Sequence, residues 1–394
     1  MVMGARPDVP TARPGVTAID TVGLVQQLAN SVLRVPFRRP WEGPASLPAN
    51  IAASVTRETV RGFMGYCSGL PIEEFRSIER LLDALSRQVM PRVVAALDVH
   101  PREGIVGGVH GRWYRPNGID PVGTILYLHG GGYIGTSPSM YGFFVAALAR
   151  RTRCEIFVAD YRLAPEFPFP AGLEDAVVVM RELQAMGVPH GRLFVAGDSG
   201  GGGLANSLVM AGDYVDMPTP AGLLLFSPEV DLRLDEPSVT ENAPHDVLPW
   251  NIPTTAYLHG LEPDSKFVSP AEADLDGYPP VFICWGDREM FRDPIRRFRS
   301  RLVEGGVDHV AVEAPGMFHV YPILMPWAGP SRQVYDEVGS FIDRLVAGHP
   351  TYENATDRTA TDDGESDGRS AKESGPSDTD DAAFDGGTER CPQS

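Results

Sequence analysis

Apolar residues recur at steps of three and four along the first hundred residues, which is the period of an amphipathic helix. Two sets show this spacing: Val22, Leu24, Val25, Leu28, Val32 and Leu33, and then Ile72, Phe75, Ile78, Leu81, Leu82 and Leu85. Between the two sets, the stretch from Pro36 to Pro48 contains several prolines and predicts a break. We therefore expect residues 1–100 to form a loose N-terminal segment followed by a helical cap.

The period changes to alternation around Val106–Tyr114, as in strands at the edge of a sheet. Short apolar runs then alternate with helical patterns. These runs are 124–128, 155–159, 193–196, 222–226, 281–285 and 310–312. Continuous apolar strands separated by helices are typical of a mostly parallel central sheet flanked by helices. We expect residues 101–348 to form this α/β domain, with a possible contribution of residues 236–262 to the cap.

Residues 349–394 contain almost no large apolar side chains, and we expect this acidic tail to be disordered because it cannot bury enough surface to fold. Within it, residues 351–394 carry 12 acidic and 4 basic residues, a net charge of −8 out of −18 for the 394 residues. The preceding residues are also acidic overall, which argues against nucleic acid as a partner, since a phosphate backbone requires positive charge.

The four cysteines give no sign of a metal site or of a disulfide framework. Cys67, Cys154, Cys284 and Cys391 lie far apart, without a Cys-x-x-Cys pair. We expect no cofactor and no metal.

No stretch approaches the ~18 apolar residues of a membrane span, and the first residues lack an apolar run of signal-peptide length. These features favour a cytoplasmic protein. The segment Val32–Trp41 mixes apolar residues with arginine, a composition that can contact an anionic membrane surface. Its prolines favour instead a connection between cap and core. A homodimer is left open.

Gly197-Asp198-Ser199-Gly200-Gly201 carries the strongest chemical signal in the chain. It follows the apolar run 193–196 and opens a segment of small residues. A Gly-x-Ser-x-Gly turn between a strand and a helix is so tight that it pushes the serine hydroxyl into a cleft. The pattern predicts that Ser199 is a nucleophile.

A serine hydroxyl needs a base that accepts its proton. His319 lies in the segment Pro315-Gly-Met-Phe-His319, a few residues after the last apolar run, 310–312. A histidine on the loop after the final strand can reach the carboxyl edge of the sheet, where the serine turn points. We therefore predict that His319 is the base.

An acid should orient this base, and the candidates follow the run 281–285. Glu289 is the preferred candidate because a carboxylate several residues beyond the strand has turned towards the histidine. Asp287 is the alternative acid, although its place directly after Gly286 also suits a side chain that holds the turn. Asp293 precedes a proline and is predicted to cap a helix.

His129-Gly130-Gly131-Gly132-Tyr133 directly follows the run 124–128. Consecutive glycines expose bare backbone N–H groups, which is what an oxyanion hole requires. We assign the donors to the N–H groups of Gly131 and Gly132, completed by that of Gly200. His129 is expected to brace the loop.

The chain resembles the hormone-sensitive-lipase-like family of α/β-hydrolase esterases over about residues 105–345. Five segments carry the resemblance: His129–Tyr133, Asp160-Tyr-Arg-Leu-Ala-Pro-Glu-Phe-Pro-Phe-Pro170, Gly197–Gly201, Val268-Ser-Pro270 with Tyr278-Pro-Pro280, and Pro315–His319. The resemblance implies an α/β-hydrolase fold with an α-helical N-terminal cap, and a Ser-His-acid esterase for short or medium acyl chains. The family's acid usually opens an Asp-Pro-Leu-Arg-Asp-like segment, and this register places Glu289 at the acid. Glutamate there departs from the family pattern, as does Gly200 where alanine is usual.

The sequence thus predicts a serine carboxylester hydrolase that acts on short- to medium-chain esters through an acyl-enzyme on Ser199. Two alternatives stay open: a non-catalytic small-molecule receptor on the same fold, and an amidase or acyltransferase that uses the same triad.

Overall fold

The computed structural model describes residues 9–42, 45–215, 217–249 and 254–348. The acidic tail lies outside these residues, so its predicted disorder stays a prediction. The strands are β1 Val99–Val106, β2 Val109–Pro116, β3 Thr124–Leu128, β4 Glu155–Ala159, β5 Leu193–Asp198, β6 Gly222–Phe226, β7 Val281–Gly286 and β8 His309–Ala314. The α-helices are α1 Pro14–Arg34, α2 Leu47–Cys67, α3 Ile72–Ala96, α4 Gly142–Thr152, α5 Ala171–Ala185, α6 Ser199–Ala211, α7 Pro237–Glu241, α8 Thr254–Leu258, α9 Arg292–Glu304, α10 Tyr321–Leu324 and α11 Gly329–Val346. Short 3-10 helices are η1 Val35–Arg38, η2 His190–Arg192, η3 Gly212–Tyr214 and η4 Pro270–Glu272.

Within the described residues the strands form one eight-stranded sheet in the order β1-β2-β4-β3-β5-β6-β7-β8. The pairings of β2 with β1 and with β4 are antiparallel, and the pairings from β4 to β8 are parallel. Every residue of β3, β5, β6 and β7 is buried, as expected for parallel strands covered on both faces. The predicted α/β-hydrolase fold with a mostly parallel sheet is confirmed.

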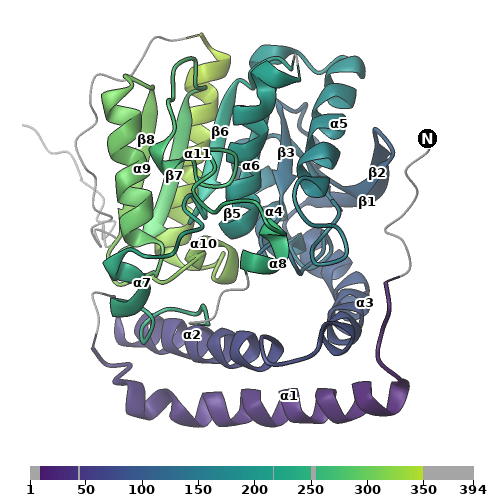
Figure 1. Ribbon diagram of the computed structural model, residues 1–394, viewed down its shortest axis with the longest axis vertical. Coiled ribbons are helices and arrows are strands. Elements are labelled where there is room, and N and C mark those ends of the chain that lie inside the picture. The colour runs from purple at the N-terminus through teal and green to yellow at the C-terminus, as the bar shows by residue number, and fades with distance from the viewer. Residues whose placement is uncertain (1–8, 43–44, 216, 250–253, 349–394) are drawn as a thin grey trace, which may run out of the picture. The chain divides into compact units, whose positions relative to one another are not determined.

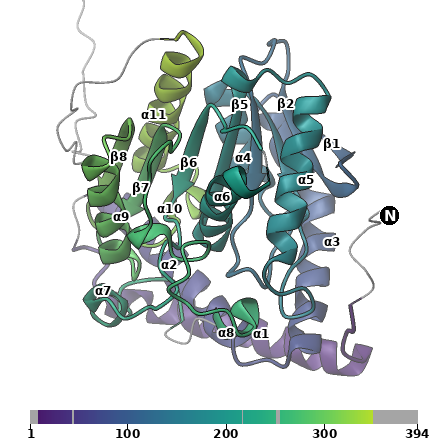
Figure 2. The ribbon, with the colours of Figure 1, turned by 45° about the horizontal axis from the view of Figure 1, so that its top comes forward.

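Helices cover both faces of the sheet (Figure 1). Each face has its own apolar core. One core joins inward-facing strand residues to α5, α6 and α9, for example through Leu183, Leu204 and Phe298. The other joins the opposite strand face to α4 and α11, for example through Phe144 and Phe341. The turned view in Figure 2 separates α5 and α6 from α11, on the other side of the strands.

Helix α1 packs on α2 and on α3, whereas α3 packs mainly on α4 and β1 of the α/β domain. Glycines allow α1 and α2 to approach closely. A Cβ added at Gly23 of α1 would overlap the hydroxyl of Tyr66, and one at Gly62 of α2 would overlap that of Ser31. Tyr66 also donates a hydrogen bond of 2.9 Å to the carbonyl of Asp20, which fixes the helix pair.

The segment Val32–Trp41 does not connect cap and core, as the sequence analysis favoured. It contains the end of α1 and the 3-10 helix η1, and it leads from α1 towards α2, two helices of the N-terminal region. The prolines end α1 without ending the helical region, because Pro36 lies at a first-turn position of η1 and Pro48 at one of α2, where proline is tolerated.

Candidate active site

The segments that carry chemistry all follow the carboxyl ends of parallel strands. The glycine loop 129–133 follows β3, Ser199 follows β5, residues 227–229 follow β6, residues 287–289 follow β7, and His319 lies beyond β8. Parallel strands present their carboxyl ends at one edge of a sheet, which is where α/β folds bind ligands. The fold therefore gathers these five segments at one edge.

Ser199 lies at the sharp turn between β5 and α6. Its φ angle is +51°, in the left-handed region that a non-glycine residue rarely adopts, and such strain costs on the order of 1–3 kcal/mol. The flanking glycines are required by space: a Cβ at Gly197 would overlap the carbonyl of Gly201, and one at Gly201 would overlap that of Leu128. This explains the Gly-x-Ser-x-Gly pattern at the level of atoms.

His319 reaches Ser199 directly. Its Nε2 lies 2.9 Å from the Ser199 Oγ, and both side chains are buried. The backbone of the histidine is fixed on both sides, since His319 N–H donates to Asp246 Oδ1 at 2.9 Å and Val320 N–H donates to the Ser227 hydroxyl at 3.0 Å. The ring of Phe291 meets the imidazole edge to face at 5.0 Å.

Burial sets the protonation state of this histidine. Loss of solvation lowers the pKa of His319 to about 3, because the charged imidazolium loses its hydration inside the protein. The resting side chain is therefore the neutral imidazole, which is the form that can accept a proton.

Glu289 lies behind the histidine. Its Oε2 is 3.8 Å from His319 Nδ1, and it accepts hydrogen bonds from the Ser227 hydroxyl at 2.7 Å and from Gly286 N–H at 3.2 Å. Among the described residues, Glu289 Oε1 and His319 Nδ1 have no hydrogen-bond partner. The two groups face each other across a distance that is longer than a hydrogen bond.

Burial raises the pKa of Glu289 well above its ordinary value, and the nearby carboxylate of Asp246 raises it further. The hydrogen bonds from Ser227 and Gly286 oppose this shift because they stabilise the ionised form. Burial thus favours the neutral carboxyl group of Glu289, whereas the hydrogen bonds from Ser227 and Gly286 favour the carboxylate.

The other two acids have different surroundings. Asp287 is partly exposed, and its Oδ1 accepts a hydrogen bond of 2.6 Å from Gly316 N–H, so it ties the turn after β7 to the loop after β8. The prediction that Asp293 caps a helix is wrong. Phe291 is the N-cap of α9, and Asp293 lies in the first turn, where its carboxylate accepts from Ser238 N–H at 3.0 Å. A tertiary contact has replaced the local one.

The glycine loop turns sharply through Gly131 and Gly132, whose φ angles are +114° and +61°. Among the described residues none accepts a hydrogen bond from the N–H groups of Gly131, Gly132 or Gly200. A Cβ added at Gly200 would lie 3.1 Å from Tyr133 N, so the glycine loop and the first turn of α6 are adjacent. Helix α6 also directs the positive end of its dipole towards this place.

A buried carboxylate joins the loop to the serine turn. Asp198 accepts from the hydroxyl of Tyr127 at 2.7 Å, from Gly130 N–H at 2.9 Å and from the hydroxyl of Tyr141 at 2.9 Å. Burial raises the pKa of Asp198 to about 6, and these hydrogen bonds limit the rise. His129 stacks on the ring of Tyr161 at 4.5 Å, a contact that suits the predicted brace.

Three further residues support the site and were absent from the sequence analysis. Asp246 accepts from His319 N–H and, at 2.6 Å, from Met290 N–H, so it joins the histidine loop to the glutamate loop. Ser227 binds both Glu289 and Val320 N–H. Its place directly after β6 was the available signal for Ser227, whereas Asp246 lies in an irregular segment and had none.

Arg76 of α3 is the third supporting residue. Its guanidinium donates to the carbonyl of Ile134, two residues beyond Gly132, and to that of Ala164 at 2.8 Å. It also pairs with Glu79 at 2.8 Å and with Glu166 at 2.6 Å. Helix α3 is therefore bonded to the loop that bears the glycines.

Within the described ranges, no group of three or more His, Cys, Asp or Glu side chains is arranged to hold a metal ion. In the same part of the chain, none of the helices is both long enough and apolar enough to cross a bilayer.

Comparisons with known proteins agree with this fold. The family model described as alpha/beta hydrolase fold matches residues 125–323. An acetyl-hydrolase of Streptomyces hygroscopicus is 34% identical over 60% of this chain and 80% of its own length. The carboxylesterase NlhH of Mycobacterium tuberculosis is 30% identical over 51% of this chain and 67% of its own.

Solved structures give the same result. An esterase from the bacterial hormone-sensitive lipase family superposes with a TM-score of 0.61 at 28% identity, and the match covers 82% of this chain and 98% of that one. A mutant of the esterase E40 gives a TM-score of 0.64 at 29% identity, over 74% and 98% of the two chains. The chain belongs to the α/β-hydrolase fold family, among the esterases related to hormone-sensitive lipase. It is a carboxylester hydrolase.

Proposed function

We propose that the chain hydrolyses short- to medium-chain carboxylic esters through an acyl-enzyme on Ser199. The observation that supports this best is the 2.9 Å contact between Ser199 Oγ and His319 Nε2, made by a buried and neutral imidazole beside backbone N–H groups of the glycine loop. The relative named acetyl-hydrolase supports a short acyl group.

In the first half of the reaction, Ser199 Oγ attacks the ester carbonyl carbon while His319 Nε2 takes the hydroxyl proton. The carbonyl oxygen becomes an oxyanion, which accepts hydrogen bonds from Gly131, Gly132 and Gly200 N–H. The tetrahedral intermediate then breaks the bond to the alcohol oxygen, and His319 returns its proton to that oxygen. The acyl group stays on Ser199.

In the second half, water attacks the acyl carbon and gives its proton to His319, and collapse of the second tetrahedral intermediate returns this proton to Ser199. Glu289 orients the imidazole and stabilises it while it is charged. The 3.8 Å between Glu289 Oε2 and His319 Nδ1 should shorten to a hydrogen bond in this state, since such contacts commonly tighten on the reaction path.

We also propose that residues 236–262 complete the cap formed by α1, α2 and α3. Arg61 of α2 donates to the carbonyls of Ala243 and, at 2.8 Å, Asp246. This contact supports a cap made of two segments that are separate in the sequence. The second segment carries Asp246, which accepts a hydrogen bond from His319 N–H.

The test of the proposed function combines labelling and turnover. A fluorophosphonate probe should label wild-type protein on the peptide that contains Ser199, and Ser199→Ala should remove both labelling and hydrolysis of p-nitrophenyl acetate, by at least about 10⁴-fold. The control Ser300→Ala changes a serine on α9 outside the site and should keep both. An unlabelled wild-type chain would favour the receptor, and amide turnover above ester turnover would favour the amidase.

A further inference from the structure

The outward face of α1 is apolar, which is unusual for an exposed helix. Ile19 is 73% exposed, Leu33 is 70% exposed, and Val22, Val25 and Val32 are also exposed. The one charged residue of α1 before Arg34 is Asp20, which is buried. A surface helix normally presents polar residues to water. An apolar face is therefore suited to contact with another apolar surface or with lipid.

The apolar face continues beyond the helix. Val22, Ala29, Leu33 and Phe37 are spaced by seven, four and four residues, so they follow one side of α1 and its 3-10 extension η1. Phe37 is 85% exposed, and Trp41, which follows η1, is 61% exposed. We call these residues the α1 face: Ile19, Val22, Val25, Ala29, Val32, Leu33, Phe37 and Trp41.

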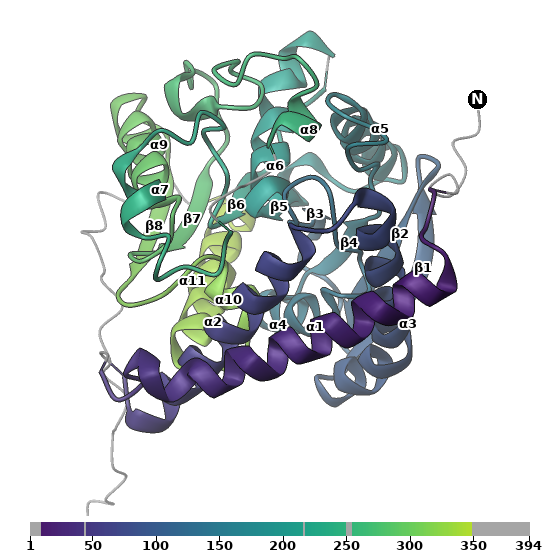
Figure 3. The ribbon, with the colours of Figure 1, turned by 60° about the horizontal axis from the view of Figure 1, so that its bottom comes forward.

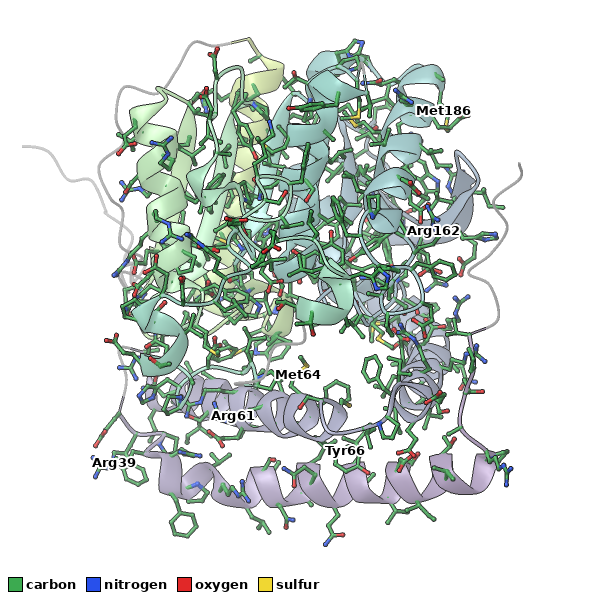
Figure 4. The ribbon with its side chains drawn as sticks, viewed as in Figure 1. Arg39, Arg61, Met64, Tyr66, Arg162 and Met186 are labelled. Atoms are coloured by element: carbon green, nitrogen blue, oxygen red, sulfur yellow. The ribbon has the colours of Figure 1, made fainter. Side chains whose placement is uncertain are left out.

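The inner side of α1 is occupied, and the α1 face is on the other side. Figure 3 shows α1 crossing in front of α2 and α3, with the sheet behind them. In Figure 4, Tyr66 lies between α2 and α1, and Arg39 lies beside the end of α1. Among the described residues, protein contacts thus account for the inner side and leave the α1 face in solvent.

The charge of the residues around the α1 face indicates which kind of partner surface can cover it. The segment 9–42 carries four arginines and two acids, a net charge of +2, although the whole chain has a net charge of −18. Arg34, Arg38 and Arg39 cluster beside Leu33 and Phe37, and Arg38 and Arg39 are only partly neutralised, by Glu58 and Glu42 at 3.4 and 3.5 Å. Apolar residues with Phe and Trp, flanked by arginine, are the features of a helix that lies in a lipid interface.

A second copy of the chain fits less well. A two-fold dimer through the α1 face would place this positive segment against a copy of itself, since such interfaces use the same patch on both subunits. Phospholipid headgroups of negative charge complement it, because basic residues near such a surface are attracted to it.

We propose that the α1 face docks this protein on a membrane surface rich in anionic phospholipid, with α1 in the interface plane. This inference goes beyond the proposed esterase activity and is independent of it, since none of the docking residues contacts Ser199 or His319. Docking would hold the cap, and not the opposite end of the sheet, against the lipid.

The test is co-sedimentation of the full chain with vesicles. Wild-type protein should pellet with vesicles of phosphatidylglycerol and phosphatidylcholine, and much less with phosphatidylcholine alone. Val22→Gln/Leu33→Gln/Phe37→Ser should lower the partition constant at least about tenfold, because it removes most of the inserted apolar surface. Arg34→Gln/Arg39→Gln should lower it less and should reduce its dependence on salt.

Matched controls separate docking from folding and from catalysis. Met186→Gln/Val303→Gln removes exposed apolar residues elsewhere (Met186 is labelled in Figure 4, far from α1) and should pellet like the wild type. The α1 variants and the Met186→Gln/Val303→Gln control should keep the wild-type hydrolysis of a water-soluble p-nitrophenyl ester. Ser199→Ala, which should be inactive, should still bind vesicles. The proposal is overturned if the wild type stays in the supernatant with anionic vesicles. It is equally overturned if light scattering shows a dimer that the α1 variant splits while vesicle binding is absent.

Discussion

The serine side and the acid side of this site differ in how far their contacts are formed in the resting structure. On the serine side, Ser199 Oγ already lies 2.9 Å from His319 Nε2, and the glycine loop is tied to the turn through Asp198. On the acid side, Glu289 stays 3.8 Å from His319 Nδ1 while its Oε2 accepts from Ser227 and Gly286.

This difference agrees with the chemistry that we propose for each side. Nucleophile and base exchange a proton in the first step, so they must be within hydrogen-bond reach at once. The acid acts on a charge that exists only after that step, when the imidazolium has formed. Tight turns therefore position the residues of the serine side. On the acid side, Ser227 and Gly286 compete with His319 for the carboxylate of Glu289.

The largest effect that separates the two candidate acids is expected from Glu289→Gln. It removes the charge that stabilises the imidazolium and should lower kcat by about 10³–10⁴-fold. Asp287→Asn removes a partly exposed acid whose carboxylate holds Gly316 N–H, and should lower kcat by less than about tenfold. Steady-state kinetics on p-nitrophenyl acetate measure both. A larger loss in Asp287→Asn would reverse the assignment.

The serine side can be tested through its glycines. A Cβ at Gly131 would overlap the carbonyl of Gly135 at a φ of +114°, so Gly131→Ala should displace an oxyanion donor and lower kcat by about 10²–10³-fold. A Cβ at Gly200 would lie 3.1 Å from Tyr133 N, a milder overlap at a φ outside the left-handed region, so Gly200→Ala should cost only a few-fold. Circular dichroism checks that both variants fold. A wild-type kcat in Gly131→Ala would contradict an oxyanion donor in the glycine loop.

A smaller effect than those of Glu289→Gln and Gly131→Ala is expected from a change in the hydrogen bonds to Glu289. Ser227→Ala removes a hydrogen bond that favours ionised Glu289, so the pKa of Glu289 should rise further above its ordinary value. A protonated carboxyl then persists to higher pH, and the acid limb of the kcat/KM profile should move to higher pH by roughly one unit, which lowers kcat/KM by up to about tenfold along that limb. An unchanged limb would mean that the ionisation of Glu289 does not control the reaction.

The strands, the position of Ser199 in the turn after β5 and the place of His319 beside it could be predicted because their signals are local. A buried parallel strand needs a continuous apolar run, and a strained turn with no room for side chains needs glycine on both sides. The resemblance to a known family added the register that favours Glu289. The α/β-hydrolase fold followed from the order of these segments.

The supporting contacts could not be predicted, because they join segments that are remote in the sequence. Asp246 meets His319 across 73 residues, and Ser227 meets Glu289 across 62. Asp293 shows the reverse error, since a local helix signal was overruled by a contact with Ser238, 55 residues away. Only the folded chain sets such pairs beside each other.

The guanidinium of Arg76 has a consequence for chimeric enzymes. This one side chain of α3 binds the carbonyls of Ile134 and Ala164 together with Glu166. A cap taken from a relative with an apolar residue at this position would remove the donor to two carbonyl oxygens beside the loop that carries Gly132. Exchange of caps between such esterases therefore has to transfer the arginine with the helix, or else redesign the loop beneath it.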